Sequence, residues 1–181
     1  MYFERGLDIV NTEKDKGLVS LHEVTRELLH EYYSGFTSDP DIFMDMSRFY
    51  NYHYDPEKID AHFASKKQTN ERKEFMIMVD DTVVGEICLK HIDYDKRECE
   101  LSIHMQNDSV KNKGYGTQAE KIAVQYAFEE LKMNTVLADA VLKNIRSQHV
   151  LEKVGFYFVR QDDTFKYYRY EREAYNKDYL L

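Results

Sequence analysis

The alternation of hydrophobic and polar residues predicts seven strands and four helices. Apolar runs, or apolar residues with a period of two, are typical of strands, whereas apolar residues three and four positions apart are typical of helices. The predicted strands are residues 18–24, 74–79, 82–90, 98–105, 135–141, 156–160 and 164–172. The predicted helices are residues 25–36, 55–66, 114–132 and 145–154.

Local signals support three of these helices. Asp55 and Pro56 are typical of a helix start, and Gly155 is typical of a helix end. The longest helix carries a stripe that should face the core, made of Ala119, Ile122, Ala123, Tyr126 and Ala127.

The order of the elements predicts an α/β fold. Short turns join the three strands between residues 74 and 105, so we expect an antiparallel meander. The strand at 135–141 follows a long helix, which is typical of a crossover to a parallel neighbour. We therefore expect a single domain over residues 1–181, with a mixed central sheet of about seven strands and helices on both faces.

The composition narrows the function classes. Of 181 residues, 43% are hydrophobic and 32% are charged, and no apolar run reaches the length of a membrane span. The net charge of −8 disfavours nucleic acid as a partner and weakly favours a cationic substrate, although solubility alone also accounts for it. Residues 1–17 lack the pattern of a secretory signal, so we expect a cytoplasmic protein with reduced thiols.

The seven histidines and two cysteines show no metal-ligand spacing, so we expect no metal site. Cys88 and Cys99 lie on neighbouring predicted strands. We interpret both as buried free thiols, because no histidine–acid pair that could activate a nucleophile is recognisable beside either.

The segment 110–132 places a Gly-x-Gly loop at the start of the longest helix. A helix N-terminus carries unpaired N–H groups and partial positive charge, and glycine lets the backbone approach an anion. Lys111 and Lys113 add charge, so the loop is a candidate phosphate or pyrophosphate site. It matches neither a Walker A sequence nor the dinucleotide fingerprint. A plain turn into a helix is the alternative.

A second motif follows the strand at 135–141: Asn144, Ser147 and the ending Lys-Val-Gly-Phe. With the loop at 111–116, which reads Lys-Asn-Lys-Gly-Tyr-Gly, it resembles the GNAT superfamily of acyl-CoA N-acyltransferases. The nearest resemblance is to its Rim-type branch of ribosomal-protein acetyltransferases. The family's loop reads Gln/Arg-x-x-Gly-x-Gly/Ala, so Lys111 is a departure that still offers a point charge. The resemblance covers residues 70–172 well and the earlier elements in outline.

The resemblance implies acetyl-CoA as co-substrate, with its pyrophosphate on the loop and its pantetheine arm along the preceding strand. The residues it assigns to this ligand are Ile103, His104, Met105, Lys111, Asn112, Lys113, Gly114, Tyr115, Gly116, Thr117 and Asn144. Asn144 also suits a helix cap, and both roles are compatible. Ser147 either bonds backbone or places its hydroxyl near the cofactor sulfur.

Acetyl transfer to an amine needs a base for the amine and, for the departing thiolate, a proton. Some family members carry a catalytic Glu where this chain has Asp139, so Asp139 is the first candidate base. Alternatively, its carboxylate only accepts hydrogen bonds from the backbone of the following loop. Glu100 is the second candidate base, or else an ion-paired strand residue. Many members use a Tyr as acid at the position of Leu151. This chain lacks that Tyr, so the general acid is Ser147 or Tyr157, or the reaction proceeds without a dedicated acid.

The segment 37–54 is rich in aromatic and acidic residues. In the family, the region around the first two helices forms one wall of the acceptor site. Carboxylates and aromatic rings suit a cationic amine, so Asp41, Asp45, Tyr50 and Tyr52 are candidate acceptor residues. Packing of the loop itself is the alternative.

The sequence therefore predicts an N-acetyltransferase that moves an acetyl group from acetyl-CoA to a primary amine by direct attack in a ternary complex. The acceptor would be a small cationic amine or a protein N-terminus. We expect no nucleic-acid or membrane partner and leave a homodimer open. The alternative function is a regulatory domain that binds acyl-CoA without turnover.

Overall fold

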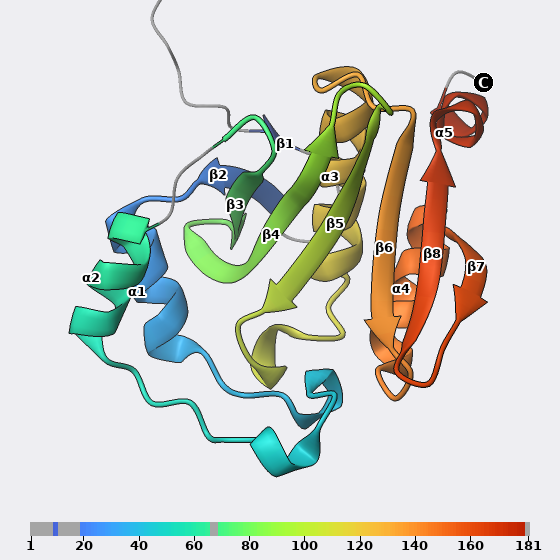
Figure 1. Cartoon of the computed structure of the whole chain (residues 1–181). Coiled ribbons are helices and arrows are strands. Elements are labelled where there is room, and N and C mark those ends of the chain that lie inside the picture. The colour runs from blue at the N-terminus through green and yellow to red at the C-terminus, as the bar shows by residue number, and fades with distance from the viewer. Residues whose placement is uncertain (1–8, 11–18, 66–68, 180–181) are drawn as a thin grey trace, which may run out of the picture.

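A computed structural model describes residues 9–10, 19–65 and 69–179, which form one mixed sheet with helices on both faces (Figure 1). The sheet has eight strands in the order β1-β2-β3-β4-β5-β6-β8-β7. They are β1 (Ile9–Val10), β2 (Val19–Glu23), β3 (Lys73–Val79), β4 (Thr82–Asp93), β5 (Glu98–Met105), β6 (Thr135–Val141), β7 (Tyr157–Gln161) and β8 (Phe165–Glu171). The helices are α1 (Arg26–Gly35), α2 (Pro56–Ser65), α3 (Tyr115–Glu129), α4 (Ile145–Val154) and α5 (Arg172–Tyr179), with short 3-10 turns η1 (Pro40–Ile42), η2 (Met46–Arg48) and η3 (Asp108–Val110).

All seven predicted strands and all four predicted helices are present, which confirms the α/β class. The predicted strand start at Leu18 and helix end at Lys66 lie outside the described residues. Two elements were not predicted. Strand β1 is too short to show a pattern. Helix α5 begins where a strand was expected to end, and its sequence is mostly polar.

The sheet separates two layers of helices. Helices α1 and α2 cover one face at its left side, whereas α3 and α4 lie behind it (Figure 1). A small core joins α1 and α2 to the sheet, formed by Leu29, Tyr32, Ile59, Met76 and Val83. The main core lies under α3 and α4. It includes four of the five predicted stripe residues, and the fifth, Tyr126, is half-buried against it.

Strands β5 and β6 pair only over part of their length. Residues 98–101 pair in parallel with residues 135–138, and no pairing is recorded beyond Leu101 and Ala138. The two strands spread apart toward their carboxyl ends (Figure 1). A gap therefore opens inside the sheet, between residues 102–105 of β5 and 139–141 of β6.

The gap exposes backbone groups of β5. The N–H of Gln106 donates to the carbonyl of Val84 on the β4 side (2.9 Å). Successive residues of a strand direct their backbone groups to alternate sides. The N–H and C=O groups of Ile103 and Met105 therefore face the gap, where an extended ligand can pair with them as an added strand.

Both cysteines are buried free thiols, as predicted, and burial raises the pKa of Cys99 to about 12. Within the described ranges, no group of three or more His, Cys, Asp or Glu side chains could hold a metal ion. No helix in the described part of the chain has the length and apolar character that a membrane span requires.

Candidate active site

Two pockets meet at the gap between β5 and β6. One, of about 100 Å³, lies beside the N-terminus of α3, and we call it the loop pocket. The other, of about 370 Å³, lies between the two strands, and we call it the central pocket. Six residues line both pockets and form what we call the junction: Ile42, Ile103, His104, Glu120, Asn144 and Ser147.

The start of α3 offers backbone donors to the loop pocket. Gly114 caps the helix with a φ of +84°, a conformation that disfavours other residues, and no described side chain caps the first turn. Gly116 lines the pocket, and a Cβ there would make only ordinary contacts with Met105 and Ile103, at 3.8 and 3.9 Å. An anion can therefore approach the helix N-terminus closely.

Two cations converge on the same pocket. The Nζ atom of Lys111 donates to Asp39 Oδ2 (2.5 Å) and Asp108 Oδ1 (2.7 Å), and Arg146 Nη1 lies 3.8 Å from Asp39. Burial alone would raise the pKa of Asp39, but the hydrogen bond from Lys111 holds it below the usual value. An incoming phosphate would compete with Asp39 for Lys111 and Arg146. Sequence reasoning missed Arg146, although it follows Asn144 by two positions.

The structure places the other predicted cofactor residues in two groups. Ile103, His104, Met105 and Asn144 line the loop pocket together with Lys111 and Gly116. Four predicted residues belong to the loop or the first turn of α3 but do not line the pocket with their side chains: Asn112, Lys113, Tyr115 and Thr117.

Asn144 and Ser147 bring α4 to the junction. The side-chain oxygen of Asn144 accepts the N–H of Ser147 (3.1 Å), so Asn144 caps α4 as expected. Both residues line both pockets. Capping therefore holds Ser147 at the junction, where its hydroxyl can serve a ligand.

Asp139 lies on β6 just beyond the last residue that pairs with β5, and it lines the central pocket. Burial, and next the negative charge of Glu100, raise the pKa of Asp139. Glu100 itself binds Lys90 (2.7 Å) and His91 (3.1 Å). Burial would raise its pKa, but these partners hold the pKa of Glu100 below its usual value. Asp139 is therefore the stronger base of the two.

Tyr157 does not reach these residues. It lies on the edge strand β7, which β8 separates from β6, and its side chain is 48% exposed. It lines neither the loop pocket nor the central pocket. The structure therefore does not place Tyr157 where a general acid is needed.

The predicted acceptor residues also lie apart from the two pockets. Asp41, Asp45 and Tyr50 are exposed, and Asp45 accepts the N–H of Ser47 at the start of η2. Tyr52 packs against the rings of Tyr33 (5.7 Å) and Phe36 (5.2 Å). Asp45 therefore fits local turn capping, which is common for this residue type, whereas Asp41 lies inside η1, where its N–H donates to the capping side chain of Asp39.

The chain matches the family model described as an acetyltransferase (GNAT) domain over residues 19–157. It belongs to the GNAT acetyltransferase family. The resemblance of the two sequence motifs to this family is thereby confirmed.

Relatives and solved structures agree with this assignment. From Bacillus subtilis, "Probable N-acetyltransferase YjcK" is 29% identical over 97 residues, 52% of this chain and 54% of that protein. "Putative ribosomal N-acetyltransferase YdaF" from the same organism is 32% identical over 80 residues, 44% of this chain and 43% of that protein. The matches thus span about half the length of these curated relatives.

Two solved structures illustrate the likeness in fold. Spermidine N-acetyltransferase from Vibrio cholerae, in complex with CoA and spermine, superposes with a TM-score of 0.71 at 15% identity, over 87% of this chain and 97% of that one. Campylobacter jejuni N-acetyltransferase PseH gives 0.56 at 23% identity, over 64% and 79%. At such identities the likeness is one of fold.

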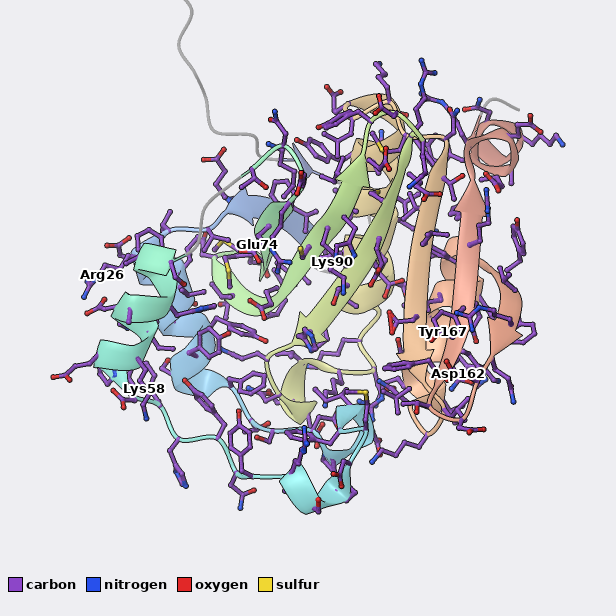
Figure 2. All side chains as sticks on the ribbon, viewed as in Figure 1. Arg26, Lys58, Glu74, Lys90, Asp162 and Tyr167 are labelled. Atoms are coloured by element: carbon purple, nitrogen blue, oxygen red, sulfur yellow. The ribbon has the colours of Figure 1, made fainter. Side chains whose placement is uncertain are left out.

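In this GNAT domain a third cavity adjoins the central pocket. This outer groove, of about 580 Å³, lies on the face of α1 and α2 and meets the central pocket at Lys90, Ser102 and His104. Figure 2 shows Glu74 and Lys90 over β3 and β4 on this face. Its polar lining comes largely from alternate positions of β3, β4 and β5: Glu74, Glu86, Lys90, Ser102 and His104. Sequence reasoning missed the groove, although these polar residues interrupt strands that are otherwise apolar.

Glu120 is the residue that the sequence reasoning missed most clearly. It lies on α3, is 1% exposed and lines both pockets. Within the described part of the chain, its Oε2 atom has no hydrogen-bond partner. Burial raises the pKa of Glu120 to about 8.

Proposed function

We propose that this GNAT domain is an acetyl-CoA-dependent N-acetyltransferase that acetylates a primary amine by direct attack within a ternary complex. One observation carries the proposal: the gap between β5 and β6 joins a pocket suited to a phosphate with a pocket that holds a desolvated carboxyl, Asp139. Such a transfer needs an anchor for the phosphates of the cofactor and, at the far end of its pantetheine arm, a base for the amine.

The cofactor would lie across the gap from α3 toward the central pocket. The first turn of α3, with Lys111 and Arg146, would bind the pyrophosphate. The open backbone groups of Ile103 and Met105 would pair with the amides of the pantetheine arm. This arrangement places the thioester at the junction, next to the central pocket.

The amine would enter from the outer groove and meet Asp139. Asp139 lies on the same sheet face as Glu100, the face that α1 and α2 cover, because its β6 neighbour Leu137 pairs with Glu100. Its raised pKa makes it a better proton acceptor for an ammonium group than an ordinary carboxylate. The neutral amine then attacks the thioester carbonyl and the C–N bond forms. The nitrogen loses its second proton as the C–S bond breaks, and the sulfur leaves as thiolate.

The lining of the outer groove bears on the acceptor. Its lining carries charges of both signs. Arg72 lies 2.5 Å from Glu74, and Lys90, which also lines the groove, lies 2.7 Å from Glu100. A groove of mixed charge suits an amine that carries other polar groups, such as a peptide N-terminus or an amino sugar, better than a bare aliphatic polyamine. We therefore propose a polar primary amine as the acceptor class.

A thiol-release assay with a panel of amines tests the proposal. The panel holds a polyamine, an amino sugar and a short peptide with a free N-terminus, each with acetyl-CoA. Release of thiol with matching acetylation of one amine is the expected result, with the polar amines ahead of the polyamine. Tight binding of acetyl-CoA with no turnover on any of them would favour the regulatory domain instead.

A further inference from the structure

Glu120 is a buried carboxyl with an unpaired oxygen, and it lies where a ligand could bond to it. Buried polar atoms in proteins are nearly always hydrogen-bonded, and an unpaired one destabilises the fold. Within the described ranges, Oε2 of Glu120 has no partner, although the side chain is 1% exposed. The residue lies one helical turn after Gly116, on the part of α3 that faces the gap.

Glu120 and Asp139 approach the gap from opposite faces of the sheet. Asp139 shares the α1 and α2 face with Glu100, whereas Glu120 belongs to α3, which lies behind the sheet (Figure 1). Glu120 is also one of the junction residues that line both pockets. The amine would thus arrive on one side of the reacting carbonyl, and the sulfur of the cofactor would lie toward the other.

We propose that Glu120 is a catalytic residue, whose carboxylic acid gives its proton to the departing thiolate of CoA. This inference rests on the proposed function. As the C–S bond breaks, sulfur takes the bonding electron pair and then the proton of Glu120, which leaves a free thiol and a carboxylate. The amine nitrogen loses two protons on going from ammonium to amide. Asp139 takes the first and passes it to solvent, and it takes the second once the C–N bond has formed. Exchange with solvent returns a proton to Glu120 and removes one from Asp139, so the cycle closes without another reactant.

The state of Glu120 suits this role. With a pKa of about 8, it is mostly protonated at neutral pH, and it is close in acidity to a thiol, whose pKa is about 8.5. Burial is the sole cause of this shift. The charged or titratable groups that line the same two pockets are Asp39, Lys90, His104, Lys111, Asp139 and Arg146.

Other groups at the junction are poorer acids. Ser147 carries a hydroxyl, which is a far weaker acid than a carboxyl. Burial and the charge of Lys90 lower the pKa of His104, so its ring is neutral at pH 7 and has little tendency to donate. Leu151, at the position where many family members carry a Tyr as general acid, is apolar and 2% exposed.

Kinetics of three variants test the inference. Glu120→Gln keeps the shape but cannot give up a proton, Glu120→Asp keeps an acid, and Glu130→Gln changes an exposed carboxylate at the C-terminal end of the same helix. We expect Glu120→Gln to lower kcat about 100-fold, within the range of general acid catalysis, with the KM for acetyl-CoA changed less than about threefold. Glu120→Asp should recover part of kcat, and Glu130→Gln should match the wild type.

The pH profile separates an acid from a structural residue. An acid must be protonated, so the wild-type kcat should fall as the pH rises above about 8. This alkaline fall should be absent from Glu120→Gln and present in Glu120→Asp. If Glu120→Gln retains the alkaline fall, or retains full activity, Glu120 is not the proton donor.

A spectroscopic readout makes the test independent of turnover. In protein labelled with ¹³C at the Glu carboxyl carbons, one resonance, assigned by its loss in Glu120→Gln, should report a protonated carboxyl at pH 7 and should move when CoA is added. A Glu120 resonance that is ionised at pH 7, or that CoA does not move, would overturn the inference. Wild-type protein that neither binds acetyl-CoA nor acetylates any amine would instead refute the proposed function.

Discussion

At the scale of single residues, the proposed chemistry depends on two carboxyls, the buried Glu120 and the half-buried Asp139. The pKa of Asp139 is raised by burial and by the charge of Glu100, whereas the pKa of Glu120 is raised by burial alone. Groups with different surroundings can take different roles in proton transfer, and we propose a base on one face of the sheet and an acid on the other.

Asp139→Asn should separate catalysis from binding. The amide cannot accept the amine proton, so we expect kcat to fall about 100-fold or more while the affinity for acetyl-CoA changes little. Steady-state kinetics and calorimetry measure the two effects. Asp163→Asn, at an exposed carboxylate in the turn between β7 and β8, is the matched control. An unchanged kcat in Asp139→Asn would remove Asp139 from the mechanism.

The pKa of Glu120 also predicts a pH-dependent stability difference. A carboxyl whose pKa is higher in the folded state loses stability as the pH rises from its unfolded value, 4.5, through its folded value, about 8. Glu120→Gln removes this loss. It should therefore raise the free energy of unfolding at pH 8 by on the order of 4 kcal/mol, or about 8–16 °C in Tm, and change it little at pH 4.5.

Thermal unfolding of wild type, Glu120→Gln and Glu130→Gln at both pH values measures this difference. The comparison between variants matters, because other carboxyls also change the stability of the wild type with pH. A Tm gain of equal size at pH 4.5 and pH 8 would show that the pKa of Glu120 is not raised.

Sequence patterns predicted some residues of the site and missed others for physical reasons. Asp139 stands out because it is polar within an apolar strand. Glu120 does not, because one polar residue beside the apolar stripe of an amphipathic helix looks like any exposed position. Its burial depends on where α3 meets the gap, and this is a tertiary property. Arg146 is likewise recognisable only once α4 lies beside Lys111.

At the scale of elements, the site depends on how two strands part. Alternation and turn residues were sufficient to predict β3, β4 and β5 to within a few residues. They could not predict that β5 and β6 pair over only four positions, because the register between strands that are distant in sequence depends on the packing of α3 and α4. The gap therefore emerged only from the structure.

Hydrogen exchange should detect this gap directly. The amides of Ile103 and Met105 face the gap and not β4, so they should exchange faster than those of Ser102 and His104. Acetyl-CoA should slow Ile103 and Met105 by about tenfold or more if its arm pairs with them, and should leave Ser102 nearly unchanged. Equal protection of all four amides before and after acetyl-CoA would contradict the predicted pairing.

At the scale of the whole molecule, the helices and the sheet form three connected cavities: the loop pocket, the central pocket and the outer groove. Of the polar residues that line the groove, His104 was predicted as a cofactor residue. The others come from segments that are distant in sequence and lie together once the sheet has formed. The net charge of −8 also gave little guidance, because two cations of the groove lie beside carboxylates, Arg72 beside Glu74 and Lys90 beside Glu100. We therefore propose that the assembled groove determines the choice of acceptor.

The central claim is that acetyl-CoA binds in the loop pocket and reaches the junction. Calorimetric titration of acetyl-CoA into wild type, Gly116→Ala and Gly116→Phe tests it most directly. A Cβ at residue 116 meets only ordinary contacts, so Gly116→Ala should bind like the wild type, whereas the ring of Gly116→Phe should fill the pocket. We predict one molecule bound per chain in wild type and Gly116→Ala, and at least about 100-fold weaker binding in a folded Gly116→Phe, a difference of about 3 kcal/mol. Equal binding by all three, or none by the wild type, would contradict the account.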